Sequence, residues 1–147
     1  MDEVVCLCSN ARRAALALTS LYDEALAPHR LKVTQFSLLH AVKRRAAPNL
    51  GALSAGTGLD RSTLGRNLRV LEGAGLVTLR TGEDPRDRVV GLTARGEETL
   101  RAATKTWLQL QQRVSGALGD DAARLLELTR RVADLARDPA RRAAALR

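Results

Sequence analysis

Apolar residues recur every three or four positions along most of the chain, which is the period of an amphipathic helix. The pattern predicts a helix over residues 7–27, another over 34–45, and a short one that starts at Leu50 and stops at Gly56-Thr57-Gly58. Three more follow over residues 61–72, 94–118 and 121–137, after which Pro139 closes the pattern and residues 138–147 read as a frayed end. Oxygen-bearing side chains that can accept free backbone N–H groups predict helix caps at Thr34, Asn49, Asp60, Thr93 and Asp120.

The helical period is interrupted between residues 73 and 92. Gly73 and Gly75 end the preceding helix, and residues 76–80 alternate as a strand does. A charged, Pro-containing turn over residues 82–88 and a return strand over 89–92 complete a hairpin. The fold class is therefore mainly α with a small β-hairpin wing.

The helix after Asp60 has two chemically different faces. Leu64, Leu68 and Leu71 recur at helical spacing and predict a buried stripe. The opposite face is free of acids and rich in donors that can reach base edges and phosphates in a major groove: Arg61, Ser62, Thr63, Arg66, Asn67 and Arg69. Together with the short helix before it and the Gly-containing turn, this predicts a helix-turn-helix whose second helix reads DNA.

The side chains of that face are expected to make two kinds of contact, one to bases and one to phosphates. Arg suits guanine and Asn suits adenine in bidentate contacts, so Arg66 and Asn67 are the predicted base readers. Arg61 and Arg69 are expected to hold phosphates.

Composition supports a helical core but says less about DNA. Of the 147 residues, 45% are hydrophobic and only 2% aromatic, so the core must be built from Leu, Ala and Val. The net charge of +8 favours polyanionic partners, although a solvated arginine-rich surface is an equal alternative. From Asp60 to Arg88 there are six arginines against five acids. The prediction of DNA binding therefore depends on the patterned face and not on bulk charge.

Two cysteines stand at the start of the first helix as Cys6-Leu7-Cys8. A helix N-terminus promotes thiolate formation, so the pair is a candidate oxidant sensor. Its spacing also suits two ligands of a soft metal, and the remaining alternative is that both are small buried or tolerated residues. His29 is expected to be solvated and His40 packed or half-exposed, and no metal site is predicted with confidence.

Other classes of protein lack support. We find no Gly-rich phosphate loop, nucleophile elbow or HExxH motif, so neither an enzyme nor a cofactor is expected. No apolar run is long enough to span a membrane, and the acidic start is unlike a secretory signal, so a cytoplasmic protein is expected.

These motifs together resemble the MarR family of bacterial regulators, over nearly the whole chain. The resemblance is carried by Leu59-Asp60-Arg61-Ser62-Thr63, by Leu71-Glu72-x-x-Gly75-Leu76-Val77, and by the Asp84-x-Arg86 and Leu92-Thr93 pairs of the wing. It implies one domain over residues 1–147, with a winged helix-turn-helix at about 32–92 and dimerisation helices at about 7–27 and 93–137. It also implies a homodimer that represses transcription from double-stranded operator DNA and is released by a small molecule or an oxidant.

The resemblance assigns further roles by residue. Arg86, and with it Arg88, is expected to enter the minor groove, and Asp60 and Asp84 are expected to steady the wing. Two alternatives stay open at this point. The terminal helices could pack on the winged unit as one monomeric core instead of joining a second copy. The winged unit could also be a protein-interaction module that binds no DNA.

Overall fold

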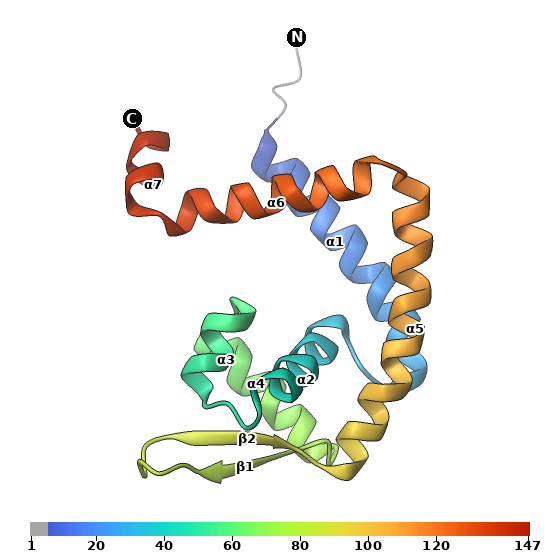
Figure 1. Ribbon diagram of the computed structural model, residues 1–147, viewed down its shortest axis with the longest axis vertical. Helices are drawn as coiled ribbons and strands as arrows, with labels where there is room; N and C mark the ends of the chain where they lie inside the picture. The colour runs from blue at the N-terminus through green and yellow to red at the C-terminus, as the bar shows by residue number, and fades with distance from the viewer. Residues whose placement is uncertain (1–5) are drawn as a thin grey trace. The chain divides into compact units, whose positions relative to one another are not determined.

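The protein is described by a computed structural model over residues 6–147. Helices dominate, and one antiparallel hairpin lies between α4 and α5 (Figure 1). The elements are α1 (Leu7–Leu26), the 3-10 turn η1 (Ala27–His29), α2 (Val33–Arg45), α3 (Leu50–Thr57), α4 (Arg61–Gly73), β1 (Val77–Thr81), β2 (Arg88–Leu92), α5 (Ala94–Leu118), α6 (Asp121–Arg137) and α7 (Pro139–Ala145). The predicted fold class is confirmed.

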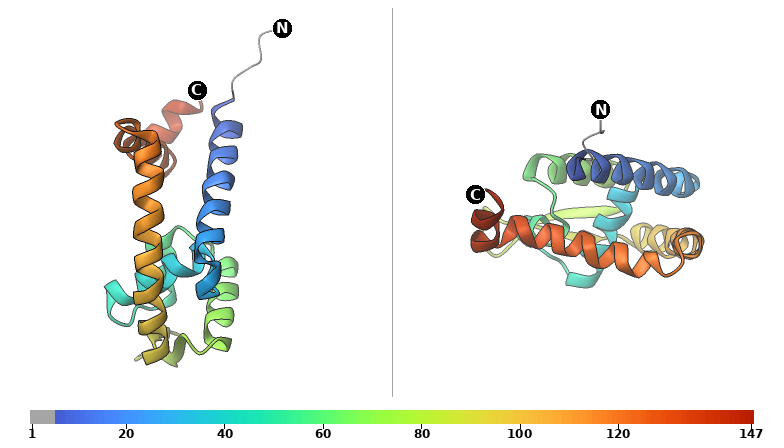
Figure 2. Two further views of the ribbon diagram at one scale, coloured as in Figure 1. Left: turned by 90° about the vertical axis from the view of Figure 1, so that its right-hand side faces the viewer. Right: turned by 90° about the horizontal axis from the view of Figure 1, so that it is seen from above.

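The chain divides into two compact units, Met1–Leu108 and Gln109–Arg147. Helix α5, drawn in yellow to orange in Figure 2, contributes residues to both units. The first unit contains α1 and the segment α2–β2, residues 33–92, which we call the winged unit. The second contains the end of α5 together with α6 and α7. In the part of the chain that the structure describes, no helix combines the length and apolarity that crossing a bilayer requires.

The core of the first unit is aliphatic, as the composition predicts. The leucine stripe of α4 is almost fully buried, with 1% of each side chain exposed, and meets Leu38, Leu39 and Leu53 from α2 and α3. Leu100 and Ala103 of α5 close the same core, and Trp107 packs at its edge, stacked on Phe36. The winged unit is thereby held to the first half of α5.

The hairpin is anchored at the end next to α5. Its register pairs Val77 with Leu92 and Thr81 with Arg88, so the turn lies at the end farther from the start of α5. At the open end, Gly96 lies against the carbonyl of Leu76 so tightly that any larger side chain would collide with that oxygen. Thr93 caps α5 by accepting from the Gly96 N–H at 2.9 Å and donates to the Gly75 carbonyl at 2.7 Å.

The start of α2 differs from the sequence prediction. Thr34 is not its cap, because the helix already begins at Val33. The free N–H groups are taken from elsewhere: Gln35 Oε1 accepts from the Lys32 N–H, and Asp23 Oδ1 of α1 accepts from the Val33 N–H at 2.7 Å. A carboxylate ten residues upstream in α1 therefore replaces the predicted local cap.

Two predictions at the C-terminal end are also wrong. Asp120 has helical backbone angles and makes no side-chain capping bond, so α6 begins without the predicted cap. Helix α6 ends at Arg137, just before Pro139, as predicted, but the predicted frayed end contains a helix. Pro139 occupies the first turn of α7, where its missing N–H costs nothing. Asp138 caps α7 by accepting from the N–H groups of Ala140 and Arg141.

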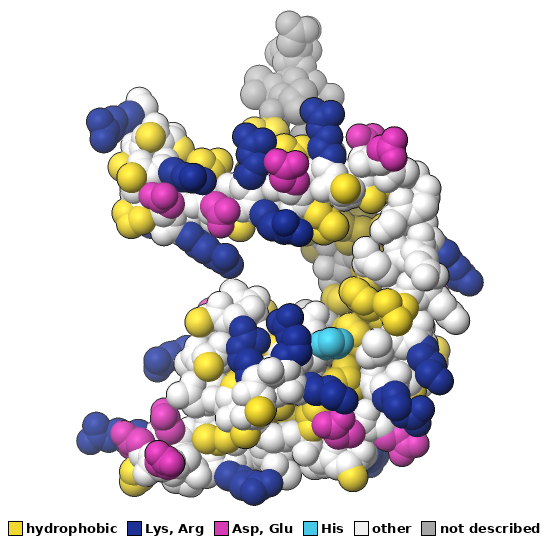
Figure 3. Space-filling model, in the orientation of Figure 1, with side chains coloured by type: hydrophobic (Ala, Val, Ile, Leu, Met, Phe, Trp, Pro, Cys, Tyr) yellow, Lys and Arg dark blue, Asp and Glu magenta, His cyan; other side chains and the backbone are white. Residues whose placement is uncertain are grey.

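Helix α6 is amphipathic, yet its apolar side chains are open to solvent in the single chain. Between 40% and 62% of each is accessible for Leu125, Leu126, Leu128, Val132 and Leu135. Hydrophobic groups are visible at the surface along this helix in Figure 3. These residues do not form a core within the chain, which counts against the monomeric alternative.

Candidate nucleic-acid interface

Helix α4 begins at a dense hydrogen-bonded cap. Gly58, with a φ of 72°, turns the chain out of α3, and Asp60 then accepts from the Thr63 N–H at 2.9 Å. The same carboxylate accepts from the Thr63 hydroxyl at 2.7 Å and from the Ser62 hydroxyl at 2.8 Å. These bonds, those of Thr63 first, hold the pKa of Asp60 well below its usual range. Asp60 is therefore charged at any physiological pH.

The six contact residues predicted for the reader helix all lie on α4 and are at least partly accessible. Arg61, Ser62, Arg66 and Arg69 are exposed, and Thr63 and Asn67 are half-buried beside them. Asn67 Nδ2 donates to the Thr63 carbonyl at 2.9 Å, which fixes the plane of its amide. The leucine stripe on the opposite side of α4 packs into the core, so this outer face is rigidly presented.

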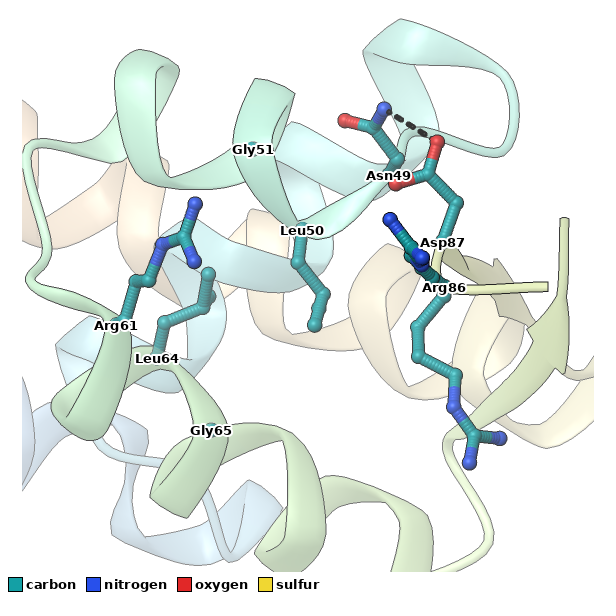
Figure 4. A pocket seen from close by; sticks show the side chains of 9 residues that line it. Asn49, Leu50, Gly51, Arg61, Leu64, Gly65, Arg86 and Asp87 are labelled. Carbon is teal, nitrogen blue, oxygen red and sulfur yellow. Dashed lines mark hydrogen bonds between the residues drawn. The ribbon is translucent and has the colours of Figure 1, made fainter. Parts of the chain in front are cut away.

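A hollow of roughly 210 Å³ joins α4 to the hairpin. Figure 4 shows Arg61 extending from the first turn of α4 toward α3, while the wing residues approach from the other side. The hollow is lined by Asn49, Leu50, Gly51, Arg61, Leu64, Gly65, Arg86, Asp87 and Arg88. The structure thus brings three of the predicted DNA-binding arginines, 61, 86 and 88, around one opening.

The tip of the wing is a hydrogen-bonded turn. Asp84 Oδ1 accepts from the Arg86 N–H at 2.8 Å, and the Asp84 carbonyl accepts from the Asp87 N–H at 2.9 Å. Arg86 and Arg88 are exposed, and both basic and acidic side chains are visible at this tip (Figure 3). Asp84 therefore shapes the turn that displays Arg86, and its wing-steadying role stays a prediction.

Asp60 has a different environment. The partners described for its carboxylate are Ser62 and Thr63, on its own helix. Among residues 6–147, no ion pair joins Asp60 to a wing arginine. A direct wing-steadying role for Asp60 stays a prediction.

Sequence reasoning missed the joint between the wing and α3. Asn49, besides capping α3 through the Ala52 N–H, donates from Nδ2 to Asp87 Oδ2 at 3.4 Å (Figure 4). The Val90 N–H donates to the Pro48 carbonyl at 3.0 Å, which adds a short backbone bridge. Because Asn49 and Asp87 are 38 positions apart, no local pattern could have linked them.

The cysteines lie where the sequence places them. Cys6 directly precedes α1, Cys8 lies in its first turn, and both are free and exposed, so neither is a buried hydrophobe in the single chain. Hydrogen bonds from the Ser9 hydroxyl, and then from the backbone of Ser9 and Cys8, hold the pKa of the Cys6 thiol below its ordinary value. Within the described residues, no group of three or more His, Cys, Asp or Glu side chains could hold a metal ion.

The histidines depart in part from expectation. His29 is half-buried, with Nε2 at 2.8 Å from the Thr106 hydroxyl, so the prediction of a solvated side chain is wrong. The fold brings α5 against η1, which the break at residues 27–30 could not reveal. His40 is half-buried and packs edge-on against Phe36, in agreement with the prediction.

Comparison with known proteins gives consistent matches. A family model described as MarR family matches residues 30–88. The M. tuberculosis transcriptional regulator MosR, in a crystal structure with DNA, is 36% identical, with a TM-score of 0.79 and coverage of 90% of this chain and 99% of its own. No curated protein matches the chain significantly.

Two further solved structures extend the similarity. The transcriptional repressor CouR, bound to a 23-mer DNA duplex, is 27% identical, with a TM-score of 0.80 and coverage of 87% of this chain and 92% of its own. The regulator PcaV from Streptomyces coelicolor, in complex with its natural ligand, is 25% identical, with a TM-score of 0.83 and coverage of 92% and 97%. With a 36% identical relative aligned over nearly its full length, the chain belongs to the MarR family of winged helix-turn-helix transcriptional regulators.

Proposed function

We propose that this chain, as a homodimer, binds an inverted-repeat DNA operator through α4 and the wing and represses transcription from it. The observation that carries the proposal is the shared opening lined by Arg61 of α4 and by Arg86 and Arg88 of the wing. It continues into the donor-rich outer face of α4. Such a surface matches a phosphate backbone flanking a groove. The DNA-bound structures of MosR and CouR add support from relatives.

Each side chain has a role that its chemistry suits. One N–H of Asn67 is used by the Thr63 carbonyl, which leaves the other N–H and Oδ1 for the paired donor and acceptor of adenine. Arg66 is exposed and suits guanine. Arg61 and Arg69 contact phosphates, and Arg86, with Arg88 beside it, enters the minor groove.

Dimerisation is supported by the exposed apolar side chains of α6. Their burial against a second copy would remove them from water, which a single chain does not do. A two-fold dimer places two reader helices one DNA turn apart, about 34 Å or ~10 bp. Operator symmetry therefore follows from protein symmetry.

The proposal is tested by selecting bound duplexes from a random pool, with reduced protein at near-physiological salt. The expected result is an inverted repeat with half-site centres ~10 bp apart. Affinity for it should fall steeply with salt, because phosphate contacts release counterions. A pool without enrichment, bound only at low salt, would favour a winged protein-interaction module and contradict the proposal.

The cysteines favour an oxidant as the signal that relieves repression. The exposed Cys6 thiolate attacks a peroxide oxygen, becomes a sulfenic acid and releases the second oxygen as hydroxide or water. Peroxide should weaken operator binding by the wild type but not by the Cys6→Ser variant, and a thiol reductant should restore it. Equal weakening of both proteins would remove Cys6 as the sensor.

A further inference from the structure

The Ser62 and Thr63 hydroxyls share one unusual feature at the start of the reader helix: both donate their single hydrogen to Asp60. The Ser62 Oγ to Asp60 Oδ1 distance is 2.8 Å and the Thr63 Oγ1 to Asp60 Oδ2 distance is 2.7 Å. A carboxylate only accepts hydrogen bonds, so the direction of both bonds is fixed. Each hydroxyl thus keeps its lone pairs free and has no hydrogen left to offer.

This polarity decides which atoms of DNA Ser62 can meet. Phosphate oxygens only accept hydrogen bonds, so a hydroxyl without a free hydrogen cannot form a hydrogen bond with them. In the major groove, the base-edge donors are the N6 amino group of adenine and the N4 amino group of cytosine. Ser62 is exposed in the first turn of α4, the part of a recognition helix that contacts base edges.

We infer that Ser62 is a specificity-determining acceptor, which reads the amino group of an adenine or cytosine on the strand it faces. The inference rests on the proposed DNA-binding function and refines it, since the sequence alone suggests only a donor-rich face. Thr63 has the same polarity but is half-buried, so Ser62 is the hydroxyl that reaches the base.

Asp60 acts here as a positioning residue. Its carboxylate also takes the Thr63 N–H, one of the free backbone donors with which a helix N-terminus binds a phosphate. With this N–H occupied and a negative charge beside it, the start of α4 disfavours a phosphate of the DNA backbone. Phosphate binding is left to the arginines around it, Arg61 and Arg69.

A glycine at position 60 removes the acceptor while α4 keeps an acceptable N-cap residue. Asn would not serve, because the oxygen that accepts from the Thr63 N–H, Oδ1, also accepts from the Ser62 hydroxyl. Gly is tolerated at an N-cap and has no side-chain oxygen, so the Ser62 hydroxyl regains a free hydrogen. Asp60→Gly should therefore change what Ser62 reads while α4 stays folded.

The test is the selection of bound duplexes by the wild type, Ser62→Ala and Asp60→Gly, followed by affinity measurement at several salt concentrations. The wild type should show adenine or cytosine at one position of each half-site. Ser62→Ala should lose that preference alone, bind about 2- to 13-fold more weakly per half-site, and keep the wild-type salt dependence. Asp60→Gly should move the preference toward guanine or thymine, which present acceptors.

Arg69→Ala is the matched control, since a lost phosphate contact weakens all sequences alike and lowers the salt slope by about one per half-site. If Ser62→Ala behaves like this control, or binds as the wild type does with an unchanged base preference, the inference is overturned. An unaltered preference in Asp60→Gly removes the role of Asp60. These results leave specific binding by the wild type intact, whereas a wild type that enriches no sequence contradicts the proposed function itself.

Discussion

Helices α4 and α6 have the same kind of sequence pattern and different surroundings. In α4, Leu64, Leu68 and Leu71 are 1% exposed and pack against α2 and α3 of their own chain. In α6, side chains at equivalent spacing, such as Leu128 and Val132, are 43% and 62% exposed. A helical period shows which face is apolar but not what covers it. The apolar face of α4 is covered within one chain, whereas that of α6 needs a second copy to cover it.

The largest effect is expected when a leucine of the buried α4 stripe is shortened. Leu68→Ala leaves a cavity in a closed core, so it should lower the free energy of unfolding by about 2–5 kcal/mol. Thermal or denaturant unfolding followed by circular dichroism measures the loss. Val70→Ala, on the exposed side of the same helix, is the control and should change stability by about 0.5 kcal/mol or less. Equal effects would mean that α4 is not packed as described.

The corresponding change in α6 should act on assembly instead of folding. Val132→Asp places a charge in the surface assigned to the second copy, so the dimer should dissociate while helical content is retained. Sedimentation velocity reports the mass and circular dichroism the helix. Ala123→Asp adds the same charge nine positions away, on the opposite side of α6, and should leave the dimer intact. A variant Val132→Asp that remains dimeric would place the interface elsewhere.

A smaller effect is expected at the wing. Arg86→Ala should weaken operator binding by about 1–3 kcal/mol without lowering the melting temperature, because the side chain is exposed and the turn depends on backbone atoms and Asp84. Fluorescence anisotropy with the selected operator measures the affinity. Arg101→Ala, an exposed arginine of α5, removes the same charge and should have little effect. Unchanged affinity in Arg86→Ala would remove the wing from the interface.

The smallest change concerns the rate at which Cys6 reacts. Its lowered pKa keeps the thiolate populated at a lower pH than for an ordinary thiol, and the rate falls only when pH drops through that lowered value. In a Cys8→Ser background, the midpoint of the alkylation rate against pH should therefore lie below the ordinary thiol value. Ser9→Ala should raise it, since the Ser9 hydroxyl is the first cause of the shift. A midpoint unmoved by Ser9→Ala would contradict this account.

The sequence predicts local features of this molecule well. The turn at Gly58, the Asp60 cap and the leucine stripe of α4 each depend on residues within one or two helical turns, and the structure confirms all three. The hairpin was also predicted to within one residue at each strand, because apolar alternation and a charged turn frame it. Which residues contact DNA stays a prediction, now with a defined geometry.

The features that were missed depend on contacts across the chain. Asp23 replaces Thr34 as the cap of α2 because α1 brings a carboxylate to that helix end. Asn49 meets Asp87 only once the wing folds back on α3. The polarity of Ser62 was missed for another reason, since a sequence shows that a hydroxyl is present but not where its hydrogen points.

Two α4 helices of a two-fold dimer should read adjacent turns of one operator. The decisive measurement is the affinity for the selected inverted repeat and for the same duplex with ~5 bp inserted between the half-sites, which is half a turn of DNA. The insertion should reduce binding to the level of an isolated half-site, because the second reader helix then faces away from its bases. Equal affinity for the two duplexes would contradict this arrangement.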